Sequence, residues 1–389
     1  MERSAILFGS PESVHMQRFI RLLLNRENGF NEIVVFNISR NDKMTENDIE
    51  FYKSLNIEII CLEPREYPNR IIRATLNYLR RKRYLKHYLR KHKKFDYCFI
   101  QYCAWQNVMW VNATKKYYRS IIPVFWGGDV LRNKILNSKI YRRFLEDSSH
   151  IILPNENSYE VFNSKTNGVY KNKAYTIQFP SSVCEKMLEY RDIVNVSEGR
   201  KQFGFPLDKK IVICGHTATR AEQYEAIIEQ LEKCNPKTIN ACCFVFFMTY
   251  APDDYRAYQA EIEDRLSKTK LNYIILKDFL QQDAMIQLHY ASDVHITMIR
   301  TDAFSCFLQE QMMAENVVIY GKWLNYFEIE NDDFFSCAVE NFGCLAEVVD
   351  DIIHNFDFYS LLTKRNPENL VKLISNDSIQ KAWMEKVFN

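Results

Sequence analysis

Two carboxylates in the second half of the chain, Asp302 and Glu310, have a spacing that suggests a binding site. Asp302 lies in a loop over residues 300–305, and Glu310 lies in a helical segment that begins near Phe304. A carboxylate in the first turns of a helix can accept hydrogen bonds from two adjacent hydroxyls. The N-terminus of the same helix offers backbone N–H groups and a positive dipole end to a diphosphate. The pair therefore predicts a site for a ligand that carries neighbouring hydroxyls and phosphates.

A second candidate for phosphate binding is the small, hydroxyl-rich loop that follows the first strand of the same half. It reads Gly215-His216-Thr217-Ala218-Thr219-Arg220, in which the threonines can donate hydrogen bonds and Arg220 can pair with a phosphate. The alternative is a plain helix cap. There is no G-x-G-x-x-G and no G-K-[ST], so a dinucleotide or P-loop site is not indicated. Other candidates for the same ligand, each of which could also be a surface residue, are Tyr250, Lys277, Arg300 and Ser305.

In the first half of the chain, a turn with two glycines displays a carboxylate after a strand. The turn reads Trp126-Gly127-Gly128-Asp129, and glycines permit an unusual backbone and the close approach of a ligand. Asp129 could act as general base for an incoming hydroxyl. His15, in the first loop between a strand and a helix, is the rival base because its pKa is near neutral. The alternatives are a helix-capping role for Asp129 and a structural or acceptor-binding role for His15.

Short apolar runs that alternate with amphipathic segments must position these residues. The runs are rich in Ile, Val and Phe with little alternation, which is typical of parallel strands buried on both faces. The predicted strands are Ser4–Phe8, Glu32–Ile38, Ile57–Leu62, Tyr97–Tyr102, Ile121–Phe125, His150–Leu153 and Ala174–Phe179, then Lys210–Cys214, Ala241–Met248, Asn272–Leu276, Val294–Met298, Val317–Tyr320 and Phe334–Val339.

The order of these elements predicts an α/β chain with two Rossmann-like, doubly wound parallel-sheet domains. We expect the first domain over residues 1–190 and the second over residues 209–370. The charged, irregular stretch 191–208 is expected to link them, and a C-terminal helix over residues 371–389 could pack back on the first domain. Such sheets bind ligands beyond the carboxyl ends of their strands, so the site residues should meet across a cleft between the domains.

Composition excludes several classes of protein. The net charge of +2 does not favour nucleic acid, and the longest apolar run, eight residues, is too short to cross a membrane. The eleven cysteines are odd in number and include no C-x-x-C, which favours reduced thiols in a cytoplasmic protein. No signal peptide and no D-x-D motif occur, so we expect neither secretion nor a metal ion, and no cofactor.

One segment is strongly basic. Residues 70–94 contain eleven Lys or Arg and no acidic residue, with Leu, Ile and Tyr at roughly helical spacing. A basic amphipathic helix can lie on an anionic bilayer. An ordinary surface helix is the alternative. The residues expected to contact the inner face of the plasma membrane are Arg80, Arg81, Lys82, Arg83, Lys86 and Arg90.

Residues 276–321 resemble the donor-binding half of GT-B glycosyltransferases, in which two acidic residues eight positions apart precede a run of small residues. Four further segments extend the resemblance: GSPESVHMQR, VFWGGDV, CGHTATRAEQYEA and FMTYAPDDYRAYQAEI. With residues 276–321 they make the chain resemble the 4-acetamido-4,6-dideoxygalactose (Fuc4NAc) transferase family over roughly residues 5–350. His216, Arg220 and the stretch after Arg300 depart from that family's pattern.

The resemblance implies an inverting enzyme of bacterial surface polysaccharide synthesis. Its donor would be a dTDP- or UDP-linked amino-deoxysugar, and its acceptor a saccharide on polyprenyl diphosphate. The first domain would bind the acceptor, with Trp126, Gly127 and Gly128 on that side, and the second would bind the donor, with Glu310 on the ribose hydroxyls. A retaining GT-B transferase, a GT-B-fold sugar-nucleotide epimerase and a non-catalytic binding protein are the alternatives.

Overall fold

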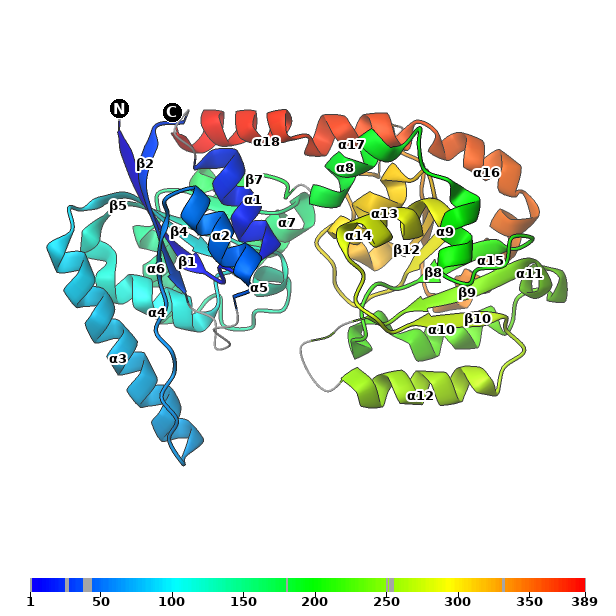
Figure 1. The fold of residues 1–389 in the computed structure, drawn as a ribbon, viewed down its shortest axis with the longest axis horizontal. Helices are drawn as coiled ribbons and strands as arrows, with labels where there is room; N and C mark the ends of the chain where they lie inside the picture. Colours follow the sequence, from blue (N-terminus) through cyan, green and yellow to red (C-terminus); the bar gives the residue numbers. More distant parts are fainter. Residues whose placement is uncertain are drawn as a thin grey trace. The chain divides into compact units, whose positions relative to one another are not determined.

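The computed structural model describes residues 2–24, 28–37, 44–179, 181–249, 251, 255–330 and 333–388, without the side chains of residues 70 and 182. The chain forms two compact units, each built on one parallel sheet (Figure 1). Unit 1 comprises Met1–Phe179 and Ile379–Asn389, and unit 2 comprises Pro180–Ser378.

Unit 1 contains seven parallel strands within its described residues, in the order β3-β2-β1-β4-β5-β6-β7. Its apolar strands are buried on both faces; Ala5, Ile6, Leu7 and Phe8 of β1 are fully buried. The strands are β1 (Arg3–Gly9), β2 (Phe30–Asn37), β3 (Glu58–Ile60), β4 (Phe95–Gln101), β5 (Tyr118–Val124), β6 (Ile151–Leu153) and β7 (Ala174–Thr176). The helices are α1 (Val14–Leu23), α2 (Glu46–Ser54), α3 (Arg70–Lys91), α4 (Trp105–Thr114), α5 (Gly128–Leu131), α6 (Lys139–Asp147) and α7 (Glu156–Lys165).

Unit 2 repeats this plan with six parallel strands in its described part, in the order β10-β9-β8-β11-β12-β13. The strands are β8 (Lys210–Cys214), β9 (Cys242–Phe247), β10 (Tyr273–Leu276), β11 (Val294–Thr297), β12 (Val317–Gly321) and β13 (Cys337–Val339). The helices are α8 (Ser182–Tyr190), α9 (Val196–Gln202), α10 (Tyr224–Leu231), α11 (Pro236–Ala241), α12 (Tyr255–Ser267), α13 (Gln282–Ala291), α14 (Cys306–Met313), α15 (Leu345–His354), α16 (Phe356–Thr363), α17 (Asn366–Ile374) and α18 (Asn376–Trp383), which runs on into unit 1.

The predicted fold class, two doubly wound parallel sheets, is confirmed, and each predicted strand corresponds to one of β1 to β13. Ile38, predicted to end the second strand, lies outside the described residues. The units divide at residues 179 and 180 rather than at 190. The expected linker, residues 191–208, includes α9, whose Arg200 forms a nearly buried ion pair with Asp293 of unit 2 at 2.7 Å.

The end of the chain packs into unit 1. Trp383 lies edge-on to Phe19 of α1, with ring centroids 5.1 Å apart, and Phe388 packs against Phe30 and Tyr97 at 5.5 Å from each. All eleven cysteines are free thiols; Cys61, expected to be buried in a strand, is exposed just after β3. Over the described residues, no helix has the length and hydropathy to cross a membrane.

Candidate functional site

The strand order of unit 2 reverses between β8 and β11, which are paired neighbours in the sheet. Open parallel sheets bind ligands at such a reversal, beyond the carboxyl ends of the two strands. The loop after β8 (residues 215–219) and the loop after β11 (residues 298–305) both begin at this edge. The amide of Arg300 donates to the Ala221 carbonyl at 2.9 Å, which joins the second loop to the end of the first.

The loop after β8 leaves the strand through a glycine that the geometry requires. Gly215 has φ +65°, and an added Cβ would lie 2.5 Å from the hydroxyl oxygen of the buried Tyr224. That hydroxyl lies 2.7 Å from the carbonyl of Thr217 and 2.8 Å from that of Phe247, so it cannot easily move. The loop is therefore held close against the end of β9.

Next to this loop, His216 and Glu222 form an imidazole–carboxylate pair. His216 Nδ1 lies 3.2 Å from Glu222 Oε1, which also accepts a hydrogen bond from Thr217 Oγ1 at 2.8 Å. The hydroxyls of Thr217 and Thr219 are 2.9 Å apart. Burial raises the pKa of the Glu222 carboxyl, and the adjacent His216 opposes that rise. Glu222 is fully buried whereas the His216 side chain is 12% exposed, so His216 is the member that a ligand can reach.

The first turn of α14 brings three histidines together around one ring. The centroids of His289, His295 and His216 lie 4.8, 5.2 and 5.7 Å from that of Phe307. Burial, reinforced by the other two histidines, lowers the pKa of His295 well below its ordinary value, so this imidazole is neutral at pH 7. The cluster fixes the start of α14 against the end of the sheet.

Glu310 is buried in α14 and does not point to bulk solvent. Its Oε1 accepts a hydrogen bond from Ser181 Oγ at 2.5 Å, and its Oε2 lies 2.9 Å from His289 Nε2. Ser181 in turn caps α8 by accepting from the amides of Val183 and Cys184. Glu310 thus ties α8 and α13 to α14, and each carboxylate oxygen has lone pairs left for a ligand.

Asp302 orders the loop at the start of α14. Its Oδ2 accepts hydrogen bonds from the amide of Ser305 at 2.8 Å and from the hydroxyl of Tyr326 at 2.7 Å. Phe304, between Asp302 and Ser305 in the sequence, has φ +58°. Residues with a side chain rarely adopt this backbone conformation, and it is often kept at functional sites. Asp302 therefore holds in place the loop that leads into α14.

The remaining predicted ligand residues of unit 2 differ in their surroundings. Arg220 lies over the ring of Tyr258 and pairs with Glu225 and Glu261, and Lys277 pairs with Glu263 at 2.6 Å. Among the described residues, no partner engages the side chains of Arg300 and Ser305, which leaves them available to a ligand at the start of α14. Tyr250 lies outside the described residues.

In unit 1, the carboxyl edge of the sheet carries an aromatic group that includes His15. The exposed ring of His15, in the first turn of α1, lies edge-on to Trp126 at 5.2 Å and near Phe179 at 6.2 Å. Trp126 donates through Nε1 to Gln101 at 3.0 Å and packs against Tyr102 at 6.0 Å. Tyr102 has φ +66°, so this edge also carries a strained residue.

Asp129 is buried and contacts the backbone of Trp126, a member of this aromatic group. Its Oδ1 accepts from the amide of Trp126 at 2.8 Å, and its Oδ2 accepts from the amide of Cys103 at 2.6 Å. Gly127, at φ +94°, makes the turn, and Gly128 begins α5. Asp129 therefore joins the loops after β4 and β5, and burial raises its pKa to about 6 against the opposing effect of these amides.

Asp129 should make the stability of the folded chain depend on pH, and Asp129→Asn should remove this dependence. Because burial raises its pKa from 3.8 to about 6, the folded state holds this proton more tightly than the unfolded state. The resulting stability is present below about pH 4 and falls by about 3 kcal/mol as the pH rises through about 6. We expect the Tm of the natural chain, measured relative to Asp129→Asn, to fall across this range. Parallel Tm curves for the two proteins would contradict a raised pKa.

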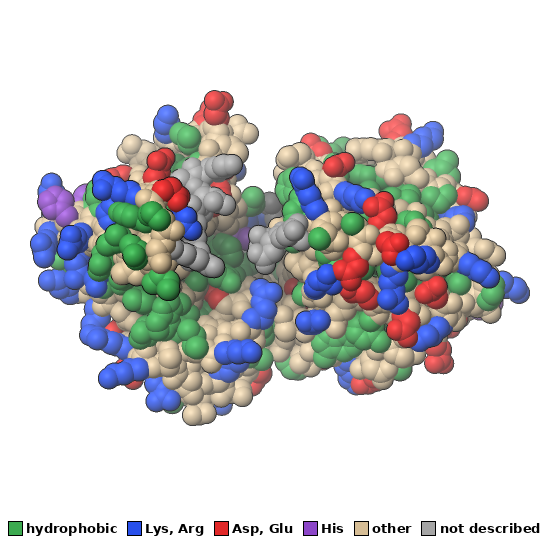
Figure 2. Space-filling model, turned by 90° about the horizontal axis from the view of Figure 1, so that it is seen from below, with side chains coloured by type: hydrophobic (Ala, Val, Ile, Leu, Met, Phe, Trp, Pro, Cys, Tyr) green, Lys and Arg blue, Asp and Glu red, His purple; other side chains and the backbone are tan. Residues whose placement is uncertain are grey.

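The basic helix α3 only partly matches its predicted role at a membrane. Arg81 is buried, and its guanidinium donates two hydrogen bonds to the Leu62 carbonyl at 2.7 and 3.1 Å. The prediction of membrane contact is wrong for Arg81, because it lies on the face that packs against the segment after β3. Arg80 also donates to a carbonyl, that of Glu63, whereas Lys82, Arg83, Lys86 and Arg90 are exposed or half-exposed. Figure 2 shows Lys and Arg side chains gathered at the margin of unit 1.

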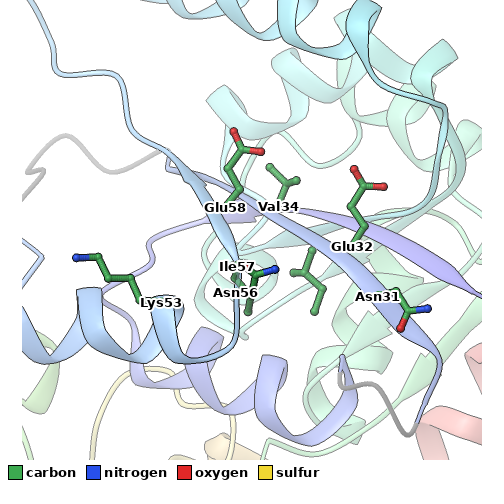
Figure 3. Close-up of a pocket in the computed structure, with 8 residues that line it drawn as sticks. Asn31, Glu32, Val34, Lys53, Asn56, Ile57 and Glu58 are labelled. Carbon is green, nitrogen blue, oxygen red and sulfur yellow. The ribbon is translucent and has the colours of Figure 1, made fainter.

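A pocket of about 420 Å³ in unit 1 lies away from these edges (Figure 3). It is formed where β2 and β3 begin, at the amino edge of the sheet, and is lined by Lys53, Asn56 and the carboxylates Glu32 and Glu58. These carboxylates already contact His92 and Tyr88. A phosphate-bearing ligand does not fit between two carboxylates, so we do not assign the site here. Over the described part of the chain, no three His, Cys, Asp or Glu side chains could hold a metal ion.

Sequence reasoning missed the buried partners Glu222, His289, His295 and Tyr326 in unit 2, and the buried Gln101 and the exposed Tyr102 in unit 1. Tyr102 could have been found from its place at the carboxyl end of a predicted strand, Tyr97–Tyr102. His289 lies within residues 276–321, the stretch that also contains Glu310, but the two residues are 21 positions apart and no sequence motif links them.

No family model matches the chain, and no curated protein matches it. Solved structures match over nearly the whole length. A structure of Anabaena HepE in complex with UDP and glucose has a TM-score of 0.74 at 12% identity and covers 99% of this chain and 100% of that chain. A glycosyltransferase from Rickettsia africae has a TM-score of 0.74 at 13% identity, with 100% of both chains covered. A UDP-GlcNAc 2-epimerase from Neisseria meningitidis reaches 0.57 at 16% identity, covering 99% of each chain.

These matches show that the chain has the GT-B fold, as predicted. At these identities they speak for the fold alone. The resemblance to the Fuc4NAc transferases is not confirmed by them.

Proposed function

We propose that this chain is a glycosyltransferase that takes its sugar from a nucleotide diphosphate. The observation that carries the proposal is the strand reversal of unit 2, where the Gly215 loop, Arg300, Ser305 and the start of α14 lie at one sheet edge. This edge provides amides and a cation for phosphates, and a buried carboxylate one turn further along the helix. The neighbouring structure of HepE, of the same fold, holds UDP and glucose.

In this proposal each group at the edge has a distinct task. Amides of the first turn of α14 and the Arg300 guanidinium hold the diphosphate and stabilise its charge as it leaves. His216, held by Glu222, donates a hydrogen bond to the same group or to the sugar. Glu310, whose direction is fixed by Ser181 and His289, accepts the two ribose hydroxyls.

Unit 1 would bind the acceptor at the edge that carries His15 and Trp126. We assign proton removal to His15 rather than to Asp129, because His15 is exposed whereas both oxygens of Asp129 hold backbone amides. Asp129 is then a positioning residue that fixes Trp126.

The finer proposal follows the family resemblance. It is an inverting, metal-independent transfer of a dTDP- or UDP-linked amino-deoxysugar to a saccharide on polyprenyl diphosphate, at the cytoplasmic face of the membrane. The second candidate is a sugar-nucleotide epimerase, which the weaker structural match to UDP-GlcNAc 2-epimerase supports. Incubation with a UDP-sugar and no acceptor separates the two, because only an epimerase would convert the donor.

A thermal-shift series with UDP, dTDP and GDP tests donor binding. A nucleotide that binds only the folded state at 100 times its Kd raises stability by about 2.7 kcal/mol. We expect one of the diphosphates to raise the Tm, and the raise to persist in EDTA. Adenosine is the control, because it lacks the phosphates that the site should hold. If no nucleotide diphosphate raises the Tm, the transferase proposal fails.

A further inference from the structure

The outer face of α3 carries one continuous stripe that is apolar at one end and basic at the other. The stripe residues recur every three or four positions, which places them along one side of a helix. They are Ile72, Leu76, Leu79, Arg83, Lys86 and Arg90. The opposite side of the helix is the buried one, with Asn77, Arg81, Leu85 and Leu89.

The apolar end of this stripe is exposed although the sequence pattern suggests burial. Ile72, Leu76 and Leu79 are 51%, 40% and 40% exposed, and the adjacent Ile71 is 77% exposed. Three neighbouring aliphatic side chains left in water on one helix face indicate an interaction surface.

Polar contacts on the inner side hold this part of α3 in its orientation. The Asn77 amide group exchanges two hydrogen bonds of 2.9 Å with the backbone of Arg65, and Arg81 donates to the Leu62 carbonyl. Rotating the helix to bury its aliphatic residues would break these bonds and leave buried polar groups without partners. The outward position of the aliphatic residues is therefore built in.

The basic end of the stripe is largely uncompensated. Residues 70–94 contain eleven Lys or Arg and no acidic residue. Arg73 pairs with Glu66 at 2.8 Å, but no ion pair with any described residue involves Arg83 or Lys86. Figure 2 shows Lys and Arg side chains beside hydrophobic side chains on the surface of unit 1.

We propose that this face of α3 docks on an anionic lipid bilayer. Ile72, Leu76 and Leu79 enter the interface between headgroups and acyl chains, while Arg83, Lys86 and Arg90 bind lipid phosphates. A second copy of the chain is a poorer occupant because its own basic stripe would be repelled. A nucleic acid would use the cations but offers the aliphatic residues little apolar surface. The proposal concerns unit 1 alone and stands apart from the transferase activity.

Vesicle flotation of the full chain tests the proposal. We expect capture by vesicles of phosphatidylcholine with phosphatidylglycerol and little capture by phosphatidylcholine alone. The pair Arg83→Gln and Lys86→Gln should weaken binding to the anionic vesicles about tenfold or more, since each cation near the surface contributes about 1 kcal/mol. The triple variant Ile72→Ser, Leu76→Ser and Leu79→Ser should weaken binding to the anionic vesicles to a similar extent. This loss should also be seen at high salt.

The matched control is Phe358→Ser with Leu361→Ser on α16 of unit 2, where the side chains are 60% and 69% exposed. This control should bind vesicles like the natural chain, and every variant should keep the Tm of the natural chain. Equal capture of the triple variant and the natural chain would overturn the proposal. So would a result in which the triple variant loses self-association, or RNA binding, rather than vesicle binding.

Discussion

Glu310→Gln is expected to lose most of its affinity for the nucleotide donor while unit 2 stays folded. A neutral amide presents one oxygen and one NH₂ group, so it cannot accept two ribose hydroxyls as a carboxylate can. The NH₂ group would also face Ser181 or His289, both of which contact the carboxylate now. Leaving one buried group without its partner costs about 1–3 kcal/mol. We expect a fall of several degrees in Tm and at least a tenfold weaker response to UDP, measured by thermal titration.

Ser181→Ala separates the binding role of Glu310 from its structural role. This change removes the hydrogen bond to Oε1 but keeps the carboxylate and its contact with His289. We expect a comparable loss of stability with a UDP affinity close to that of the natural chain. If Glu310→Gln and Ser181→Ala respond to UDP alike, Glu310 only ties α8 and α13 to α14, and the proposed donor site loses its ribose contact.

The strands could be predicted because burial on both faces requires short, nearly continuous runs of apolar residues. The predicted strand Lys210–Cys214 has the bounds of β8. The predicted strand Ala241–Met248 is one residue longer at each end than β9, Cys242–Phe247. The order of strands and helices then leaves few topologies, and the observed sheets follow the doubly wound one. The candidate sheet edges follow from this topology, since all parallel strands end on the same side.

The partners of the site residues could not be predicted, because they come from distant parts of the chain. Glu310 contacts residues 21 and 129 positions away. Arg220 shows the same difficulty, because a distant residue pairs with a side chain that the sequence suggests for a ligand. Its place after a strand suggested a phosphate ligand, but Glu261, 41 positions further on, lies close enough to pair with it. Local spacing in the sequence predicts neither contact.

The orientation of α3 shows a second limit of sequence patterns. Its aliphatic residues suggest an inward stripe, yet the hydrogen bonds of Asn77 and Arg81 to the backbone of residues 62–65 turn most of them outward. Side chain to backbone bonds of this kind depend on where a neighbouring segment runs, which hydrophobic periodicity does not record.

Gly215→Ala is expected to be strongly destabilising and to abolish the response to nucleotides. The backbone at φ +65° disfavours any Cβ, and here that atom would lie 2.5 Å from the hydroxyl oxygen and 2.6 Å from a ring carbon of Tyr224. Strain of about 1–2 kcal/mol and overpacking of about 1–3 kcal/mol together lower stability by roughly 3 kcal/mol. For a domain of this size that corresponds to a fall in Tm of roughly 10 °C. Relief of the clash would also displace His216 and Thr217 from the sheet edge, so the UDP-dependent shift should disappear.

Gly204→Ala is the matched control for this change. Gly204 has φ +68°, nearly the same backbone conformation, but an added Cβ would meet no atom within 4 Å. Its substitution should therefore cost only the backbone strain, about 1 kcal/mol, and leave the response to UDP intact. The difference in Tm between the two variants measures the close packing of the loop on Tyr224, independently of the left-handed backbone. Equal stability of the two would mean that the loop does not lie against Tyr224, and the arrangement of His216 and Thr217 argued above would then be wrong.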